Sequence, residues 1–89
     1  MTHELKCWPD QFQALIDERK GFEFRRNDRD FNVDDTLFLR EYDPDTDTFS
    51  GRTCRRRVTY ILREGFGLPG GTVVMSVKPI PEVEPRERG

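Results

Sequence analysis

Alternation of apolar and polar side chains with a period of two dominates this sequence, and only one short segment has the period of a helix. Segments of this kind are typical of strands that are buried on one face. Five are predicted here: His3–Trp8, Lys20–Arg25, Thr36–Tyr42, Arg52–Leu62 and Thr72–Pro79. A chain of 89 residues has room for one hydrophobic core. The sequence therefore predicts one small α+β domain, a barrel of five to six strands with one helix after the first strand.

The helical segment follows the first predicted strand directly. Pro9 suits the first helical position and Asp10 suits the first turn. An apolar stripe facing the core is predicted from the i, i+3, i+4 spacing of Phe12, Leu15 and Ile16. Gly21 either ends this helix or begins the next strand, so the helix leads the chain straight into Lys20–Arg25.

Connecting segments and one terminal segment complete the organisation. Asp43–Gly51 is polar and turn-forming, and it is predicted to join two strands of a hairpin. Gly65–Gly71 lacks the Lys-Ser/Thr ending of a phosphate-binding loop, so it is interpreted as a turn and no cofactor is predicted. The domain is predicted to occupy residues 1–80, and residues 81–89, which are charged and contain proline, to form a flexible tail.

Charge and cysteine content exclude several classes of protein. A net charge of −2 argues against a protein that coats nucleic acid non-specifically, because such binding depends on neutralising phosphates. Two local clusters of arginine, 25–29 and 52–57, are either solvated surface or functional patches. Cys7 and Cys54 do not make a disulfide framework, and together with His3 they do not have the spacing of a zinc site. With no signal peptide or membrane-length apolar run, the protein is predicted to be cytoplasmic, without a metal or a membrane partner.

The stretch Arg19–Phe31 contains the strongest candidate site. Phe22 and Phe24 alternate with Glu23 and Arg25, so one face of this strand is apolar and the other carries an acid beside a base. One interpretation is an outward-facing ion pair that contributes little. The other is a polar site in which Glu23 accepts hydrogen bonds from a ligand while Lys20 and Arg25 pair with a phosphate or a carbonyl.

Several segments of the chain resemble ASCH domains, which belong to the PUA-like superfamily. The resembling segments are His3–Lys6, Arg19–Phe31, Leu39–Pro44, Val58–Leu62, Gly65–Leu68 and Val73–Lys78. ASCH domains share a Gly-x-Lys-x-x-x-x-Arg segment, in which Lys20 and Arg25 match the two basic positions and Glu18 stands at the glycine. The resemblance implies a PUA-like mixed β-barrel with a helix near one opening and a cleft for RNA or a modified nucleoside.

Two functions follow from this resemblance. The first is binding of RNA, a nucleotide or a nucleoside, with an aromatic side chain stacked on a base. The residues expected to take part are Lys6, Trp8, Lys20, Glu23, Arg25, Asn27, Asp28, Arg29 and Asp30. The second is hydrolysis of a modified nucleoside such as N4-acetylcytidine, an activity of some ASCH relatives, with Lys20 and Glu23 as catalytic groups. Glu23 stands where those relatives have threonine, and Thr72–Lys78 contains no glutamate to match theirs.

Overall fold

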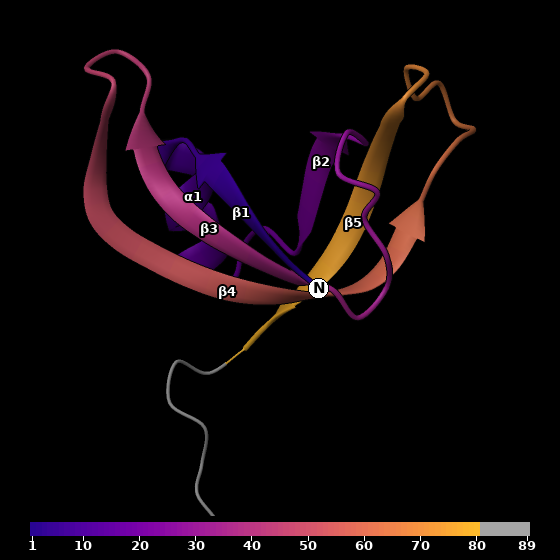
Figure 1. The fold of residues 1–89 in the computed structure, drawn as a ribbon, viewed down its shortest axis with the longest axis horizontal. Helices are drawn as coiled ribbons and strands as arrows, with labels where there is room; N and C mark the ends of the chain where they lie inside the picture. The colour runs from indigo at the N-terminus through magenta and orange to yellow at the C-terminus, as the bar shows by residue number, and fades with distance from the viewer. Residues whose placement is uncertain (81–89) are drawn as a thin grey trace, which may run out of the picture.

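The protein folds as a half-barrel of five strands with one helix, and Figure 1 shows it down its shortest axis. This computed structural model describes residues 1–80, so the predicted tail lies outside the described residues. The elements are β1 (Thr2–Cys7), α1 (Pro9–Ile16), β2 (Phe22–Arg26), β3 (Thr36–Asp43), β4 (Thr48–Leu62) and β5 (Thr72–Pro79). All five predicted strands and the single helix are therefore confirmed, with small changes in their bounds.

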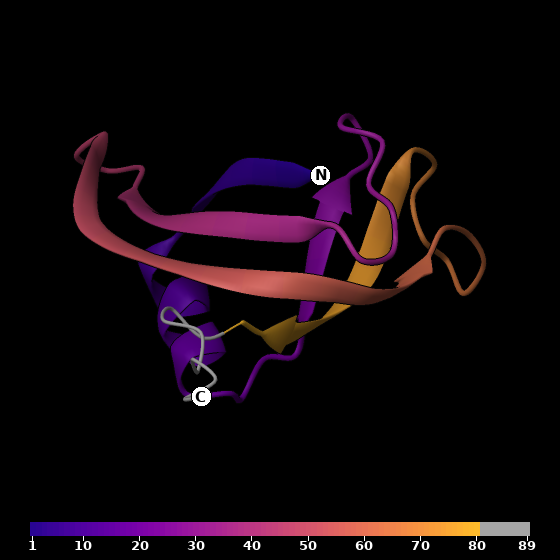
Figure 2. The ribbon, with the colours of Figure 1, turned by 60° about the horizontal axis from the view of Figure 1, so that its bottom comes forward.

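The sheet is mixed and has the strand order β1-β3-β4-β5-β2. β1 runs parallel to β3, and every other neighbouring pair is antiparallel. β4 is long enough to pair with β3 through its first part and with β5 through its second part, as Figure 2 shows. A register shift between Val58 and Tyr60 bends β4 between the part that pairs with β3 and the part that pairs with β5. This bend brings β1 and β2, the first and last strands of the sheet, to opposite sides of one opening.

The core lies inside the curve of the sheet and under α1. It is built from inward residues of β1, β3, β4 and β5 together with Phe12 and Leu15 of the helix and Phe31 of the loop that follows β2. β1 contributes His3, Leu5 and Cys7, as its alternation predicts, and leaves Glu4 and Lys6 exposed. Arg56 is buried as well, and its guanidinium donates a 2.9 Å hydrogen bond to the carbonyl oxygen of Leu15 near the end of α1. A cation at this position stabilises the helix because the last carbonyls of a helix carry partial negative charge.

Three details of the sequence prediction are wrong. Ile16 is 40% exposed, because the stripe of this eight-residue helix that meets the core is narrow and holds only Phe12 and Leu15. The alternation of Val58 and Tyr60 with Thr59 along Arg52–Leu62 predicts one common face for Val58 and Tyr60, but the bulge between them leaves Tyr60 65% exposed while Val58 is buried. The helix ends at Ile16, before a turn in which Glu18 takes a positive φ of 61°, so it does not lead directly into β2.

The polar insert forms the turn of the β3–β4 hairpin, as predicted, and β4 begins earlier than expected, at Thr48. Residues 65–71 connect β4 to β5. Within the part of the chain that the structure describes, the helix is too short to cross a membrane.

Candidate functional site

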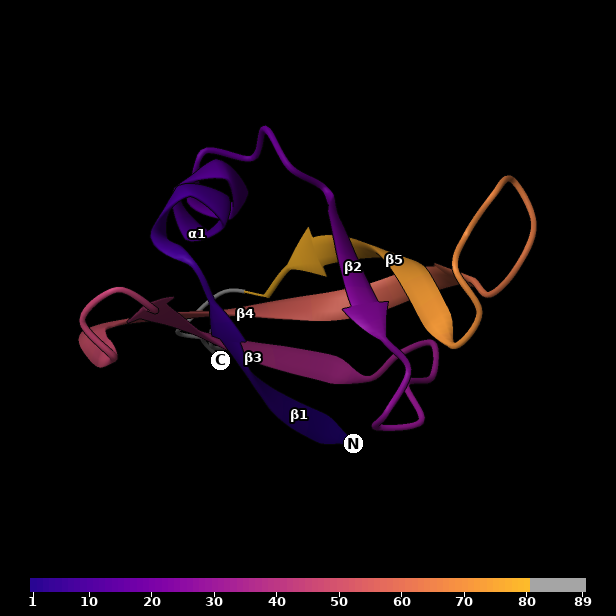
Figure 3. The ribbon, with the colours of Figure 1, turned by 90° about the horizontal axis from the view of Figure 1, so that it is seen from above.

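The opening of the half-barrel, between the edge strands β1 and β2, is where the candidate residues gather. Figure 3 looks into this opening from above, with α1 beside it. Two arginines cross from the β2 side to backbone carbonyls of β1. Arg25 donates a 2.7 Å hydrogen bond to the carbonyl of Lys6, and Arg29 donates a 3.3 Å bond to that of Glu4. The opening is thus bridged by side chains, and a cleft lies on each side of the bridge between Arg25 and Lys6.

The cleft on the α1 side, called here the aromatic cleft, has a volume of about 390 Å³. Its lining combines a polar interior with three partly exposed aromatic residues. It consists of Lys6, Cys7, Trp8, Gln11, Lys20, Phe22, Glu23, Phe24 and Arg25. Trp8, Phe22 and Phe24 are 58%, 47% and 50% exposed, whereas Glu23 is 2% exposed. The cleft therefore offers flat apolar surfaces at its edge and a carboxylate at its base.

Glu23 is held at both carboxylate oxygens by cations. Lys20 Nζ lies 3.1 Å from Oε2, and Arg25 Nε lies 3.0 Å from Oε1. Lys20 Nζ also donates a 2.5 Å hydrogen bond to the side-chain oxygen of Gln11 on α1. A buried carboxylate needs such partners, because its desolvation is otherwise costly. With two cations on one carboxylate, this cluster has an excess of positive charge beside the cleft.

The outward-facing interpretation of the Glu23–Arg25 pair is therefore excluded. Glu23 pairs across the sheet with the buried Met75 and points into the half-barrel, while Phe22 and Phe24 occupy the opposite face of β2. The face that the alternation marks as apolar is the outer one. The polar face points inward because β2 is the last strand of the sheet, and its inner side borders the opening.

Cys7 is buried next to this cluster. Burial, reinforced by the negative charge of Glu23, raises the pKa of its thiol to about 12. A thiol is a nucleophile only as the thiolate, so Cys7 is unsuited to nucleophilic catalysis at neutral pH.

Cys7 is consequently expected to react with iodoacetamide at least about a hundredfold more slowly than a free thiol at about pH 8, because its thiolate is scarce. Mass spectrometry of peptides after timed labelling measures the rate at each cysteine separately. The same protein in concentrated guanidinium chloride serves as the control and should label at the rate of glutathione. Labelling of native Cys7 at that rate would contradict its burial beside Glu23.

The second cleft, called here the basic cleft, lies on the other side of the Arg25–Lys6 bridge and has a volume of about 500 Å³. Five of its lining residues are cationic and two are acidic. The cations are Lys6, Arg25, Arg26, Arg29 and Arg40, and the acids are Glu4 and Asp28. Phe49, from the β3–β4 hairpin, forms part of the wall. The local excess of positive charge contrasts with the net charge of −2 of the whole chain.

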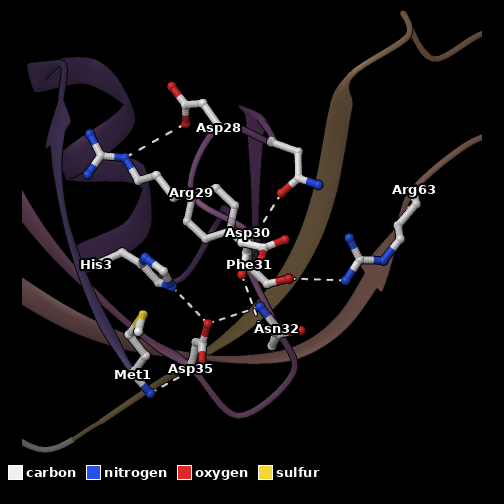
Figure 4. Close-up of polar contacts among 10 residues, drawn as sticks. Met1, His3, Asp28, Arg29, Asp30, Phe31, Asn32, Asp35 and Arg63 are labelled. Atoms are coloured by element: carbon white, nitrogen blue, oxygen red, sulfur yellow. Dashed lines mark hydrogen bonds and ion pairs between the residues drawn. The ribbon is translucent and has the colours of Figure 1, made fainter.

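The loop that follows β2 is anchored by a buried network, drawn in Figure 4. Asp35 accepts hydrogen bonds from His3 Nε2 at 2.8 Å, from the Asn32 amide at 2.9 Å and from the amino group of Met1 at 3.2 Å. Burial opposes ionisation of Asp35, but these hydrogen bonds outweigh it and hold the pKa of this carboxyl below its usual range. Phe31 is buried against the His3 ring. The network fixes the end of the loop, and thereby positions Arg29 over β1.

Comparison with known proteins places the chain in a family. Residues 2–77 match the family described as "Domain of unknown function (DUF3850)". This match covers most of the chain. The chain belongs to the DUF3850 family. It is also similar to a protein of Escherichia phage P2 described as an uncharacterized 12.9 kDa protein in the GpA 3′ region, with 35% identity over 57 residues. The aligned segment is 64% of this chain and 50% of the phage protein, so the chain matches about half the length of that relative.

This DUF3850 domain brings most of the predicted site residues together. Lys6, Trp8, Lys20, Glu23 and Arg25 all line the aromatic cleft. Asp28 and Arg29 line the basic cleft.

Asn27 and Asp30 line neither cleft and instead shape the loop that carries Asp28 and Arg29. Asn27 accepts a 3.3 Å hydrogen bond from the amide of Phe31, and Asp30 has a positive φ of 56°. Among residues 1–80, no group of three or more His, Cys, Asp or Glu side chains is arranged to hold a metal ion.

Sequence reasoning missed two kinds of site residue in this DUF3850 domain. Gln11 was not singled out, although it lies in the first turn after Pro9, close to the opening. Arg40 and Phe49 come from a hairpin distant in sequence. Arg40 is the register partner of Lys6 in the parallel β1–β3 pair, and Phe49 pairs with Tyr42 in the hairpin, so strand pairing brings both to the cleft. Of the second arginine cluster, Arg56 is buried under α1 and the Arg52 guanidinium lies 4.9 Å from the Phe12 ring centre. Those two arginines support the helix.

Proposed function

We propose that this domain binds RNA or a nucleotide and holds one nucleobase in the aromatic cleft. The observation that carries this proposal is the buried Glu23 carboxylate, bound by Lys20 and Arg25 at the base of a cleft lined by three partly exposed aromatic residues. Base edges carry both donors and acceptors, so a carboxylate beside two cationic donors matches them chemically. Aromatic side chains bind bases through stacking, which depends little on the identity of the base.

The same cluster favours an anionic ligand over a neutral one. Lys20 and Arg25 bring two positive charges to one carboxylate, so the site has one positive charge in excess. Lys6 adds a further cation on the β1 side of the cleft. A nucleotide phosphate satisfies this excess, whereas a free nucleoside does not. We place this function in the cytoplasm, where reducing conditions keep a buried cysteine such as Cys7 in its thiol form.

We infer in addition that the domain is PUA-like and related to ASCH domains. Three features support this inference: a mixed five-stranded half-barrel, a helix directly after the first strand, and the meeting of Lys20 and Arg25 at a single carboxylate. A fold supports many functions, so the proposed function rests on the cleft and the fold adds to it only as an analogy.

Hydrolysis of a modified nucleoside such as N4-acetylcytidine is a second candidate. It is favoured by one contact, the 3.1 Å approach of Lys20 Nζ to Glu23 inside the aromatic cleft. However, Lys20 acts here as a hydrogen-bond donor to both Gln11 and Glu23. A general base must instead present an unprotonated amine to the substrate. The geometry therefore supports binding better than catalysis.

Lys20→Ala is expected to weaken nucleotide binding by about tenfold, because it removes a charge-assisted hydrogen bond from the site. Thermal shift and NMR titration with nucleosides, nucleoside 5′-monophosphates and short RNAs measure the affinity. Lys78→Ala removes an exposed lysine outside both clefts, so it is the matched control and should bind like the parent protein.

Each outcome of this titration discriminates between the candidates. Shifts confined to residues around the aromatic cleft, and weakened in the Lys20 variant, support binding. Release of acetate from N4-acetylcytidine that stops in the Lys20 variant while its affinity persists would favour the hydrolase. Absence of saturable shifts with every ligand would contradict both functions.

A further inference from the structure

The two clefts share a boundary made of the same side chains. Lys6 and Arg25 line both the aromatic cleft and the basic cleft, and the hydrogen bond from Arg25 to the Lys6 carbonyl lies between them. A ligand that extends past this boundary therefore enters a second cavity of about 500 Å³. The boundary itself is cationic, which is the property that a bridging phosphate requires.

The cations of the basic cleft are held in place by aromatic rings and by β1. The Arg40 guanidinium lies 3.8 Å from the Phe49 ring centre and pairs with Glu4 at 2.8 Å. The Lys6 ammonium lies 4.3 Å from the Tyr42 ring centre. These groups are already positioned before a ligand binds. Ordering them on binding therefore costs less free energy than ordering mobile surface side chains.

We propose that the two clefts form one site for two consecutive nucleotides of a single-stranded RNA. The first base occupies the aromatic cleft, the phosphate that joins the nucleotides lies at the boundary formed by Lys6 and Arg25, and the second nucleotide occupies the basic cleft. This inference rests on the proposed function and specifies its ligand. Single-stranded RNA is favoured over a duplex, because only unpaired bases can be turned apart into separate cavities.

The length dependence of binding tests this inference. The affinities of AMP, CMP, GMP and UMP are compared with those of the 5′-phosphorylated dinucleotides pApA, pCpC, pGpG and pUpU by isothermal titration calorimetry. For at least one base, the dinucleotide is expected to bind about tenfold more tightly than the mononucleotide, through the added stacking and phosphate contacts. The dinucleotide affinity should also fall more steeply with salt, by a slope of about 0.7 for each added phosphate contact.

Variants of the basic cleft test whether its residues provide the higher affinity for the dinucleotide. Arg40→Gln and Arg26→Gln are each expected to reduce the dinucleotide affinity about threefold to tenfold and to leave the mononucleotide affinity unchanged. Arg57→Gln makes the same charge change at an exposed position of β4 outside both clefts, so it should change neither. Two separate variants guard against loss of folding in one of them, which circular dichroism detects.

The outcomes separate the two proposals. Equal affinities for mononucleotides and dinucleotides would overturn the two-nucleotide site and leave the proposed function standing. A length dependence that Arg57→Gln reduces as much as Arg40→Gln would also overturn it, because the gain would then come from overall charge. Failure of both ligand classes to bind would overturn the proposed function itself.

Discussion

Replacing Glu23 with alanine is expected to lower the free energy of unfolding by about 3 kcal/mol, because it leaves two cations without their shared carboxylate in a largely buried place. The side chain of Glu23 is 3% exposed, and the side chains of Lys20 and Arg25 are 13% and 25% exposed. This residual exposure lets the two cations regain some water, so the expected loss lies at the lower end of the range for broken buried ion pairs. Urea denaturation followed by circular dichroism measures it.

Two companion variants show whether Glu23→Ala loses stability because the charge of the carboxylate is removed. Glu23→Gln keeps the shape and one acceptor oxygen, and it should cost less than the alanine variant. The double variant Lys20→Met, Glu23→Leu removes an ion pair as a unit, and it should recover part of the stability, because well-packed apolar replacements of buried pairs are often neutral. If Glu23→Ala unfolded no more easily than the parent protein, the cluster would be solvated, and the base of the aromatic cleft would not be as described.

The order of the local elements was predictable because alternation and helix-start signals are local properties. Side chains on a strand alternate between faces, so the period of two marks β1, β3 and β5 directly. Pro9 and Asp10 mark the start of α1 for equally local reasons. Tyr60 shows the limit of this reasoning. One register shift reverses the face of the residues that follow it, and the sequence carries no plain signal for that shift.

The residues of the candidate site were predictable from the sequence, but the position of the site in the fold was not. Lys20, Glu23 and Arg25 were identified because charges cluster around one short strand. Their inward direction was left open, since alternation tells which residues share a face and not which face is inside. The basic cleft depends on the strand order, which sets β1 opposite β2 and brings the β3–β4 hairpin near them. The hairpin lies near β1 because β3 pairs with β1, and β2 lies opposite β1 because β4 bends; local patterns encode neither.

Replacing Phe12 with alanine is expected to have the largest effect on stability, about 4 kcal/mol, because it opens a cavity beneath α1 in a fully buried position. A domain of this size has a total stability of only about 4 to 13 kcal/mol, so much of it would be lost. The helix also carries Gln11, and Trp8 stands at its start, so nucleotide affinity should fall together with stability. Urea denaturation and NMR titration measure the two effects.

Ile16→Ala is the matched control, because it shortens an apolar side chain on the same helix at a position that is 40% exposed. It is expected to cost less than about 1 kcal/mol, since little apolar surface returns to water. The amphipathic pattern alone treats Phe12 and Ile16 alike, whereas the structure separates them by their burial. Equal losses from the two variants would mean that α1 packs on the sheet with a broader face, and the aromatic cleft, whose wall includes Gln11, would then have a different shape.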